Sequence, residues 1–150
     1  MNTAQKTLQE AISEYSSEIA ALAEALISKG CAKAPGANLL VYDAYNALAV
    51  GFSANDKQSG IVFSITSYPR WVSLFFPRGT ELADPEGLLK GSGKTIRHVV
   101  IEDVDHFDDP AIQTLIDQAL AFCDPPVSIE AKGEVIIKSV SARKRPRRPE

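Results

Sequence analysis

The chain has 150 residues, of which 45% are hydrophobic and 23% are charged, and its net charge is −3 at pH 7. This composition predicts one globular domain with a single hydrophobic core. No apolar run approaches the roughly 20 residues that cross a bilayer, and the N-terminus lacks the apolar segment of a secretion signal. We therefore expect a cytoplasmic protein without a membrane partner, in which Cys31 and Cys123 are reduced thiols.

The charges are unevenly distributed along the chain. Residues 1–137 carry 10 Lys/Arg and 18 Asp/Glu, a net charge of −8, whereas residues 138–150 carry 6 and 1, a net charge of +5. An acidic body therefore precedes a basic tail. Because nucleic-acid binding needs a basic surface against the phosphates, the body is not expected to bind nucleic acid.

The first segment, Thr3–Ser28, has the pattern of one long amphipathic helix that ends at Gly30. Its apolar stripe recurs every three or four residues: Leu8, Ile12, Tyr15, Ile19, Leu22 and Leu26. Acidic residues at Glu10, Glu14 and Glu18 form a ridge on the opposite side. This ridge is either a surface for a cation or a basic partner, or a face that only keeps the helix soluble.

Strands are predicted next, beginning with Leu39–Tyr42 and Ala47–Phe52 around a turn at Tyr42–Asn46. A hairpin follows in Gly60–Gly79, where two alternating apolar segments flank a Tyr-Pro-Arg turn. We expect one face of this hairpin to pack on helices, through Ile61, Phe63, Ile65, Val72, Leu74 and Phe76. The other face carries hydroxyl groups together with Trp71 and Phe75, which predicts a half-solvated or partner-covered surface.

The second half of the chain is predicted to contain two helices and two strands. The segment Asp84-Pro85-Glu86 predicts a short helix over Pro85–Lys90, and Asp109-Pro110 begins a helix that continues to Phe122. Thr95–Glu102 is a strand whose end, Val99–Ile101, should be buried on both faces. Val135–Val140 is either one more strand or an arm that docks on a neighbour.

The order of these elements predicts an α+β fold. Sequential strands with short links favour an antiparallel sheet of about five strands, with both helices on one face in a two-layer sandwich. We assign residues 1–125 to this domain. Residues 126–150 form a C-terminal extension, in which Ser141–Glu150 is basic, rich in proline and expected to be disordered.

None of the sequence motifs for catalysis or metal binding is specific. Gly91-Ser-Gly-Lys-Thr95 lacks the first glycine of a phosphate-binding loop and precedes a strand instead of a helix, although Lys94 and Arg97 could bind an anion. The acidic segment Glu102–Asp109 has oxygen ligands for a hard cation but lacks the calcium-loop spacing, so a solvated loop with a helix cap is the alternative. No nucleophile lies in a recognised catalytic motif, and we expect no enzyme activity.

The tail residues Arg143–Arg148 are a strong electrostatic feature with little specificity. They could meet an acidic partner, a second copy of the chain in a homodimer or, weakly, nucleic acid, or they could only improve solubility.

Three segments resemble the YdhG-like family, a bacterial family named as a domain of unknown function. They are Val41–Leu48, Tyr68–Phe76 and Asp84–His98, and the resemblance extends over roughly Glu18 to Phe122. It implies a frataxin-like fold, with two helices against an antiparallel sheet, and no enzyme activity. One relative is described as an iron chaperone that binds iron through its acidic surface, so the resemblance also implies a metal surface here.

These observations lead to three functional hypotheses. The first is a non-enzymatic domain whose solvated sheet face, including Thr66 and Ser73, binds a small anionic or aromatic ligand or a protein. Its candidate ligand-binding residues are Tyr42, Tyr45, Asn46, Arg70, Trp71, Phe75, Lys94 and Arg97. The second is weak binding of iron or another divalent metal, for which the candidates are Glu10, Glu14, Glu18, Asp103 and Asp105. The third is an interaction protein that docks through its basic tail.

Overall fold

The computed structural model describes residues 1–149 as an α+β fold with one open, mixed six-stranded sheet. The helices are α1 (Thr3–Ser13), α2 (Ser17–Lys33), α3 (Val104–Phe107) and α4 (Pro110–Phe122). The strands are β1 (Asn38–Asp43), β2 (Leu48–Ser53), β3 (Ile61–Ser67), β4 (Val72–Phe76), β5 (Arg97–Ile101) and β6 (Val135–Val140). Within residues 1–149, no helix is long and apolar enough to cross a membrane.

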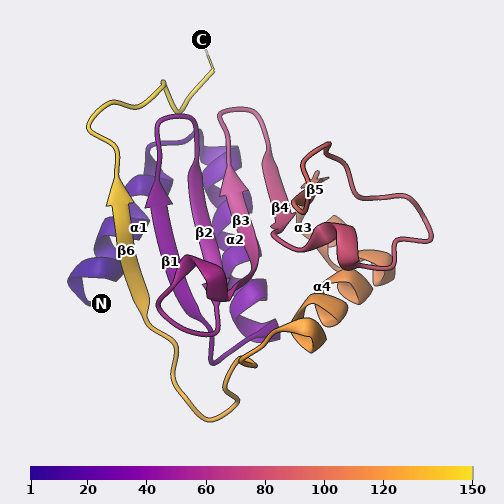
Figure 1. Cartoon of the computed structure of the whole chain (residues 1–150). Helices are drawn as coiled ribbons and strands as arrows, with labels where there is room; N and C mark the ends of the chain where they lie inside the picture. Colours follow the sequence, from indigo (N-terminus) through magenta and orange to yellow (C-terminus); the bar gives the residue numbers. More distant parts are fainter. Residues whose placement is uncertain (150) are drawn as a thin grey trace.

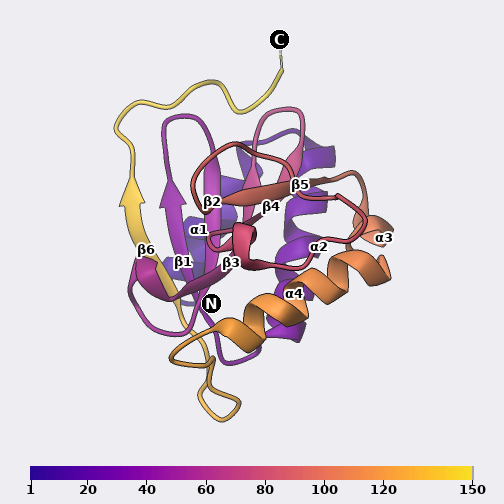
Figure 2. The same ribbon diagram turned by 45° about the vertical axis from the view of Figure 1, so that its right-hand side comes forward.

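The strand order in the sheet is β5-β4-β3-β2-β1-β6. The first five strands form an antiparallel meander, as predicted, and β6 adds to β1 in parallel. Figure 1 shows α1 and α2 behind the sheet, and Figure 2 shows how far β5 is twisted from the direction of β6. Of the two alternatives for Val135–Val140, the structure shows one more strand, so the sheet has six strands instead of about five and is mixed instead of antiparallel at this edge.

The core lies between the helices and one face of the sheet. Cross-strand neighbours Val41, Val50, Ile65, Leu74 and Val99 form an apolar row on this face. They pack with buried residues of three helices, which are Leu8, Ala11, Ile12, Ile19, Ala23, Leu26, Ile112, Leu115, Ile116 and Ala119. The alternation in the sequence predicted this face of the hairpin correctly, with one exception.

That exception is Ile61, which lies on the opposite face. The pairing of β2 with β3 shifts register between Phe52 and Ser53, so that Phe52 pairs with Phe63 and Ser53 with Ile61. As a result Val62 joins the core in place of Ile61. Such a bulge inserts one residue into the alternation, and the sequence pattern alone does not locate it.

The predicted long helix is two helices with a break at Glu14–Ser16. Ser16 caps α2 by accepting a hydrogen bond from the amide of Ile19, and Glu14 ends α1. The acidic ridge is therefore interrupted, because Glu18 belongs to a different helix from Glu10 and Glu14. Gly30 does not end α2, which continues to Lys33; it lies inside the helix, where the ring of Phe52 leaves no room for a Cβ.

Two further predictions in the second half of the chain are wrong. The segment Pro85–Lys90 is not a helix, because the Asp84 carboxylate accepts hydrogen bonds from the amides of Leu88 and Leu89 and holds a turn instead. Val100 is 38% exposed, since β5 is an edge strand with only one face against the core.

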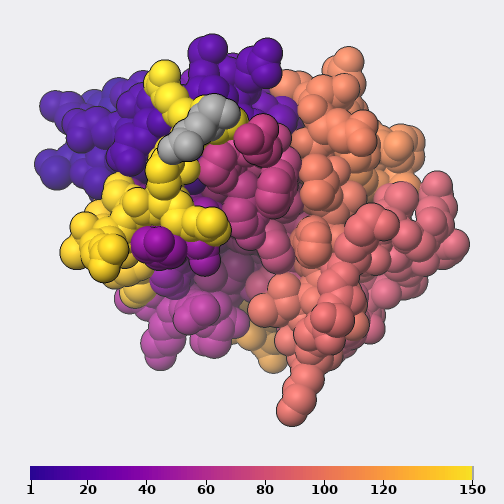
Figure 3. Space-filling view, turned by 90° about the horizontal axis from the view of Figure 1, so that it is seen from above, coloured from indigo at the N-terminus to yellow at the C-terminus, as the bar shows by residue number. Residues whose placement is uncertain are grey.

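The basic tail lies against the body of its own chain over residues 141–149, in contrast to the predicted disorder. Figure 3 shows it crossing one end of the molecule between the N-terminal helices and the sheet loops. Arg147 is only 5% exposed, because its guanidinium is enclosed by the end of β1 and the α1–α2 break.

Candidate functional site

A mainly apolar depression lies on the face of the sheet opposite α1 and α2, and we call it the open-face pocket. Its volume is about 320 Å³. The residues that line it come from four strands and the loops beside them: Tyr42, Ala49, Gly51, Gln58, Ile61, Ser64, Thr66, Tyr68, Phe75, Pro77 and Ile96.

The floor of the pocket follows from the strand register. Tyr42, Ala49 and Thr66 are successive neighbours in one cross-strand row, which continues to Ser73 in β4. The adjacent row places Gly51, Ser64 and Phe75 side by side. Because these positions alternate with core positions along each strand, all of them must face away from the helices.

Gly51 lies in the floor of the pocket, where the lack of a side chain leaves space for Ile61. A Cβ on Gly51 would lie 2.6 Å from Cδ1 of Ile61, which the register shift has turned onto this face. A larger residue at position 51 would therefore displace Ile61, a wall of the pocket.

The polar side chains of the pocket are neutral: the hydroxyls of Tyr42, Ser64, Thr66 and Tyr68 and the amide of Gln58. The hydroxyls of Ser64 and Thr66 lie 3.4 Å apart. Within residues 1–149, the buried hydroxyl of Tyr42 has no hydrogen-bond partner, and neither has that of Ser73, which lies beside the pocket in the row of Thr66. Burial raises the pKa of Tyr42 and of Tyr68, so both phenols stay protonated and can donate a hydrogen bond.

Aromatic contacts extend beyond the pocket on both sides. Tyr68 stacks on Trp71 with ring centroids 5.0 Å apart, and Phe75 stacks on His98 at 4.9 Å. Trp71 is 43% exposed, and it lies next to the pocket instead of lining it. The pair of Tyr68 and Trp71 thus links the pocket to the β3–β4 turn.

The predicted ligand-binding residues are only partly brought together. Tyr42 and Phe75 line the open-face pocket. Arg70 and Trp71 line a different groove, together with α2 and the end of β5. Tyr45 and Asn46 are exposed in the β1–β2 turn, where they contact the tail.

The other two predicted cations, Lys94 and Arg97, also lie outside the open-face pocket. The Arg97 guanidinium donates hydrogen bonds to the carbonyl oxygens of Gly93 and Ile96, at 2.6 and 2.7 Å, and Lys94 is exposed. None of the described residues that line the pocket is charged. Of the two small-ligand classes that the sequence suggested, anionic and aromatic, the uncharged lining therefore fits a neutral aromatic ligand better.

Residues that the sequence did not single out complete the pocket. Ser64 has the same alternation signal as Thr66, two residues away on the same face of β3. The sequence indicates Tyr68 only as the residue before a turn-forming proline. The sequence pattern does not place Ile61 or Ile96 in the pocket. Ile61 faces it because of the register shift between β2 and β3, and Ile96 belongs to a loop that is distant in the sequence.

The predicted metal-ligating residues do not form a cluster. Glu14 pairs with Lys144, and Asp103 caps α3 by accepting a hydrogen bond from the amide of His106. Glu10 and Asp105 are exposed, and Glu18 lies with Asp103 along the groove that contains Trp71. In the part of the chain that the structure describes, no three His, Cys, Asp or Glu side chains are grouped to hold a metal ion.

The cysteines were predicted to be reduced, and both are free thiols in the structure. Burial raises the pKa of Cys31 and is the main reason for the raised pKa of Cys123. Each is therefore held in the unreactive thiol form at neutral pH.

Comparison with known proteins returned no match. No family model, curated protein or solved structure is significantly similar to this chain.

Proposed function

We propose that this protein is a non-enzymatic binding domain whose small-molecule ligand occupies the open-face pocket. The observation that carries the proposal is a pocket of about 320 Å³ in which the Tyr42 hydroxyl is buried without a hydrogen-bond partner among the described residues. Ligand sites are typically apolar concavities with a few convergent polar groups. A buried donor that is left unpaired costs about 1–3 kcal/mol, and a small turn of the Tyr42 side chain toward a ligand acceptor would recover it.

The ligand class follows from the lining. Tyr42, Tyr68 and Phe75 offer aromatic surfaces, while Ser64 and Thr66 offer hydroxyl groups that can donate or accept. Since the described lining has no charge to neutralise an ion, the ligand is neutral. We therefore propose a flat, largely apolar molecule that carries a carbonyl or another hydrogen-bond acceptor for Tyr42.

We further propose that the chain is a cytoplasmic relative of the YdhG-like proteins, with a frataxin-like two-layer arrangement. The support is the segment resemblance described above and the order of elements: N-terminal helices, an antiparallel meander, and then α4. The two free thiols support a reducing compartment. Strand β6, parallel to β1, is an addition to that arrangement.

The test uses the tryptophan of the chain. Trp71 is the only one, and it stacks on Tyr68 at the pocket wall, so a bound ligand should change its fluorescence. A library of neutral aromatic fragments should give saturable fluorescence changes with the wild type. Ala49→Leu fills the floor of the pocket and should abolish them.

The matched control is Val100→Leu, which adds apolar volume on the same cross-strand row but outside the pocket. This variant should bind fragments like the wild type. If Ala49→Leu retains binding, or if no fragment gives a saturable change, the open-face pocket is not the ligand site.

A further inference from the structure

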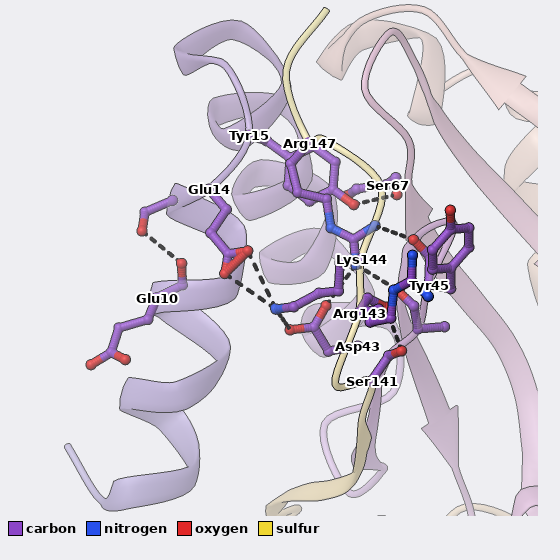
Figure 4. A network of polar contacts seen from close by, with 12 residues as sticks. Glu10, Glu14, Tyr15, Asp43, Tyr45, Ser67, Ser141, Arg143, Lys144 and Arg147 are labelled. Atoms are coloured by element: carbon purple, nitrogen blue, oxygen red, sulfur yellow. Dashed lines mark hydrogen bonds and ion pairs between the residues drawn. The ribbon is translucent and has the colours of Figure 1, made fainter.

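The basic tail ends in a pocket that is built for a guanidinium group. Arg147 is enclosed by the end of β1, the β1–β2 turn and the α1–α2 break, as the close view in Figure 4 shows. Its Nη2 donates to Oδ1 of Asp43 at 2.8 Å and to the carbonyl oxygen of Ala44 at 2.5 Å, and its Nη1 donates to the carbonyl oxygen of Tyr45 at 3.2 Å. The guanidinium carbon lies 5.6 Å from the centroid of the Tyr15 ring.

Each wall of this pocket is held in place by the fold. The Tyr15 hydroxyl donates to the carbonyl oxygen of Ser67 at 2.8 Å, which fixes the ring. Asp43 is 5% exposed and lies at the helix-facing end of β1, opposite Leu48 in the register. A planar fork of donors, an aromatic face and a buried carboxylate together select arginine over lysine.

A second cation site adjoins the first. Lys144 donates to the other carboxylate oxygen of Asp43 at 2.8 Å and to Glu14 at 3.3 Å, so one buried carboxylate holds both cations. The hydrogen bond to Asp43 raises the pKa of Lys144. The two adjoining sites therefore bind a lysine and an arginine that are three residues apart, in a Lys-x-x-Arg spacing.

One hydrogen-bond donor of the bound tail has no partner in this site. The Nε atom of Arg147 is buried, yet it has no hydrogen-bond partner within residues 1–149. The segment reaches the site only after crossing the end of the sheet from β6, and its connecting residues Arg143, Arg145 and Pro146 are exposed. A tethered segment with one unmet donor and few buried residues is one that another segment can replace.

We propose that this end of the molecule is an arginine-selective peptide-binding site, occupied in cis by the protein's own tail. Its partner in trans is a basic segment of another polypeptide with the Lys-x-x-Arg spacing. Because the tail is tethered, it competes at an effective concentration on the order of millimolar, and release of the tail is what opens the site. The site is independent of the open-face pocket, since the two share no residue.

The test opens the site in the full-length chain with the double variant Lys144→Ala/Arg147→Ala. The probe is a synthetic peptide with the sequence of residues 142–149, and calorimetry measures its binding. The double variant should bind one peptide per chain, and the wild type should bind it at least about tenfold more weakly because its own tail competes. A peptide with lysine in place of the residue corresponding to Arg147 should bind about tenfold more weakly than the original.

The matched control is Lys132→Ala/Arg143→Ala, which removes the same charge from exposed positions and leaves the site occupied. It should behave like the wild type. Equal binding by both double variants, or equal binding of the arginine and lysine peptides, would overturn the proposal, because general electrostatic attraction would then explain the result.

If the opened variant does not fold, the single variant Arg147→Ala is titrated with methylguanidinium. Millimolar methylguanidinium should raise the melting temperature of this variant and leave that of the wild type unchanged. The same shift in both proteins, or none in either, would also overturn the proposal.

Discussion

At the scale of single residues, Arg147 and Asp43 show how a polar pair is stabilised inside this fold. The side chains of Arg147 and Asp43 are 3% and 7% exposed, and both carboxylate oxygens of Asp43 are paired. A buried charge is tolerated when its partners are complete and becomes costly when one of them is removed. The sequence marked these residues only as part of a basic run and a turn, because the pairing joins positions 104 residues apart.

The first prediction concerns the Asp43 carboxylate. Asp43→Asn should lower the free energy of unfolding by about 3–5 kcal/mol, because it leaves two cations against a neutral amide. Urea denaturation measures the change. The control Asp56→Asn lies in an exposed loop and should stay within about 0.5 kcal/mol of the wild type. A similar small loss for both variants would contradict the structural role of Asp43.

The second prediction concerns Tyr15 at high pH. Desolvation is the main cause that raises the pKa of Tyr15 from 10.0 to about 12. Because the folded state then holds the phenol proton more tightly than the unfolded state, its stabilising effect is complete below pH 10.0 and is lost as the pH rises to about 12.

Unfolding measured at pH 8 and at successive values up to pH 12 tests this. Tyr15→Phe should lose about 1 kcal/mol at pH 8, where its hydrogen bond to Ser67 is missing, and should be less sensitive to high pH than the wild type. Tyr45→Phe, at an exposed tyrosine, should keep the wild-type pH dependence. Identical pH profiles for the wild type and Tyr15→Phe would contradict the prediction.

At the scale of elements, the sequence predicted the strands and the last helix correctly. It did not predict the helix break at Glu14–Ser16 or the register shift between β2 and β3. The meander and the helix Pro110–Phe122 follow from alternation and capping, which are local signals. The break at Glu14–Ser16 was missed because Tyr15 fits the apolar stripe on either side, although Ser16 is a good cap. The turn of Ile61 onto the other face depends on a register shift that involves a second strand.

The candidate site was predicted only in part, because local alternation is visible in the sequence and tertiary placement is not. Alternation placed Thr66, Ser73 and Phe75 on the open face correctly. It could not show that the Arg97 side chain turns to the carbonyls of its own loop, or that Arg70 points to another groove. Charged side chains at loop positions are placed by tertiary contacts, which the sequence pattern does not report.

The third prediction tests the packing of α2 on β2. Gly30→Ala should lower the free energy of unfolding by about 1–3 kcal/mol through overpacking, although alanine favours helices, because its Cβ would lie 2.5 Å from the Phe52 ring. Thermal denaturation measures the change. Gly93→Ala is the matched control, since its nearest neighbour is 4.0 Å away. A Gly30→Ala protein that is as stable as the wild type would show that α2 and β2 are not packed this closely.

At the scale of the whole molecule, β6 and the tail complete the sheet edge that the meander leaves open. Leu40 in β1 is fully buried and pairs with Ile136 of β6. An uncovered strand of this kind would offer its unpaired backbone groups to another chain. The C-terminal segment therefore protects β1 in addition to supplying Lys144 and Arg147.

The fourth prediction follows from this protection. A chain that ends at Glu134 should be less stable than the full chain and should elute as larger assemblies in size-exclusion chromatography. A chain that ends at Val140 retains β6, so it should lose stability without this self-association. Equal elution volumes for the chain that ends at Glu134 and the full-length chain would show that β1 needs no cover.

The central claim, that a neutral ligand binds on the open face of the sheet, is tested most directly by crystallography of the wild-type protein with neutral aromatic fragments. We predict that fragments bind over Thr66, between Tyr42 and Phe75, with an acceptor within hydrogen-bond distance of the Tyr42 hydroxyl. Fragments that bind only in the groove beside Trp71, or none on the open face at concentrations that saturate the fluorescence change, would contradict the account.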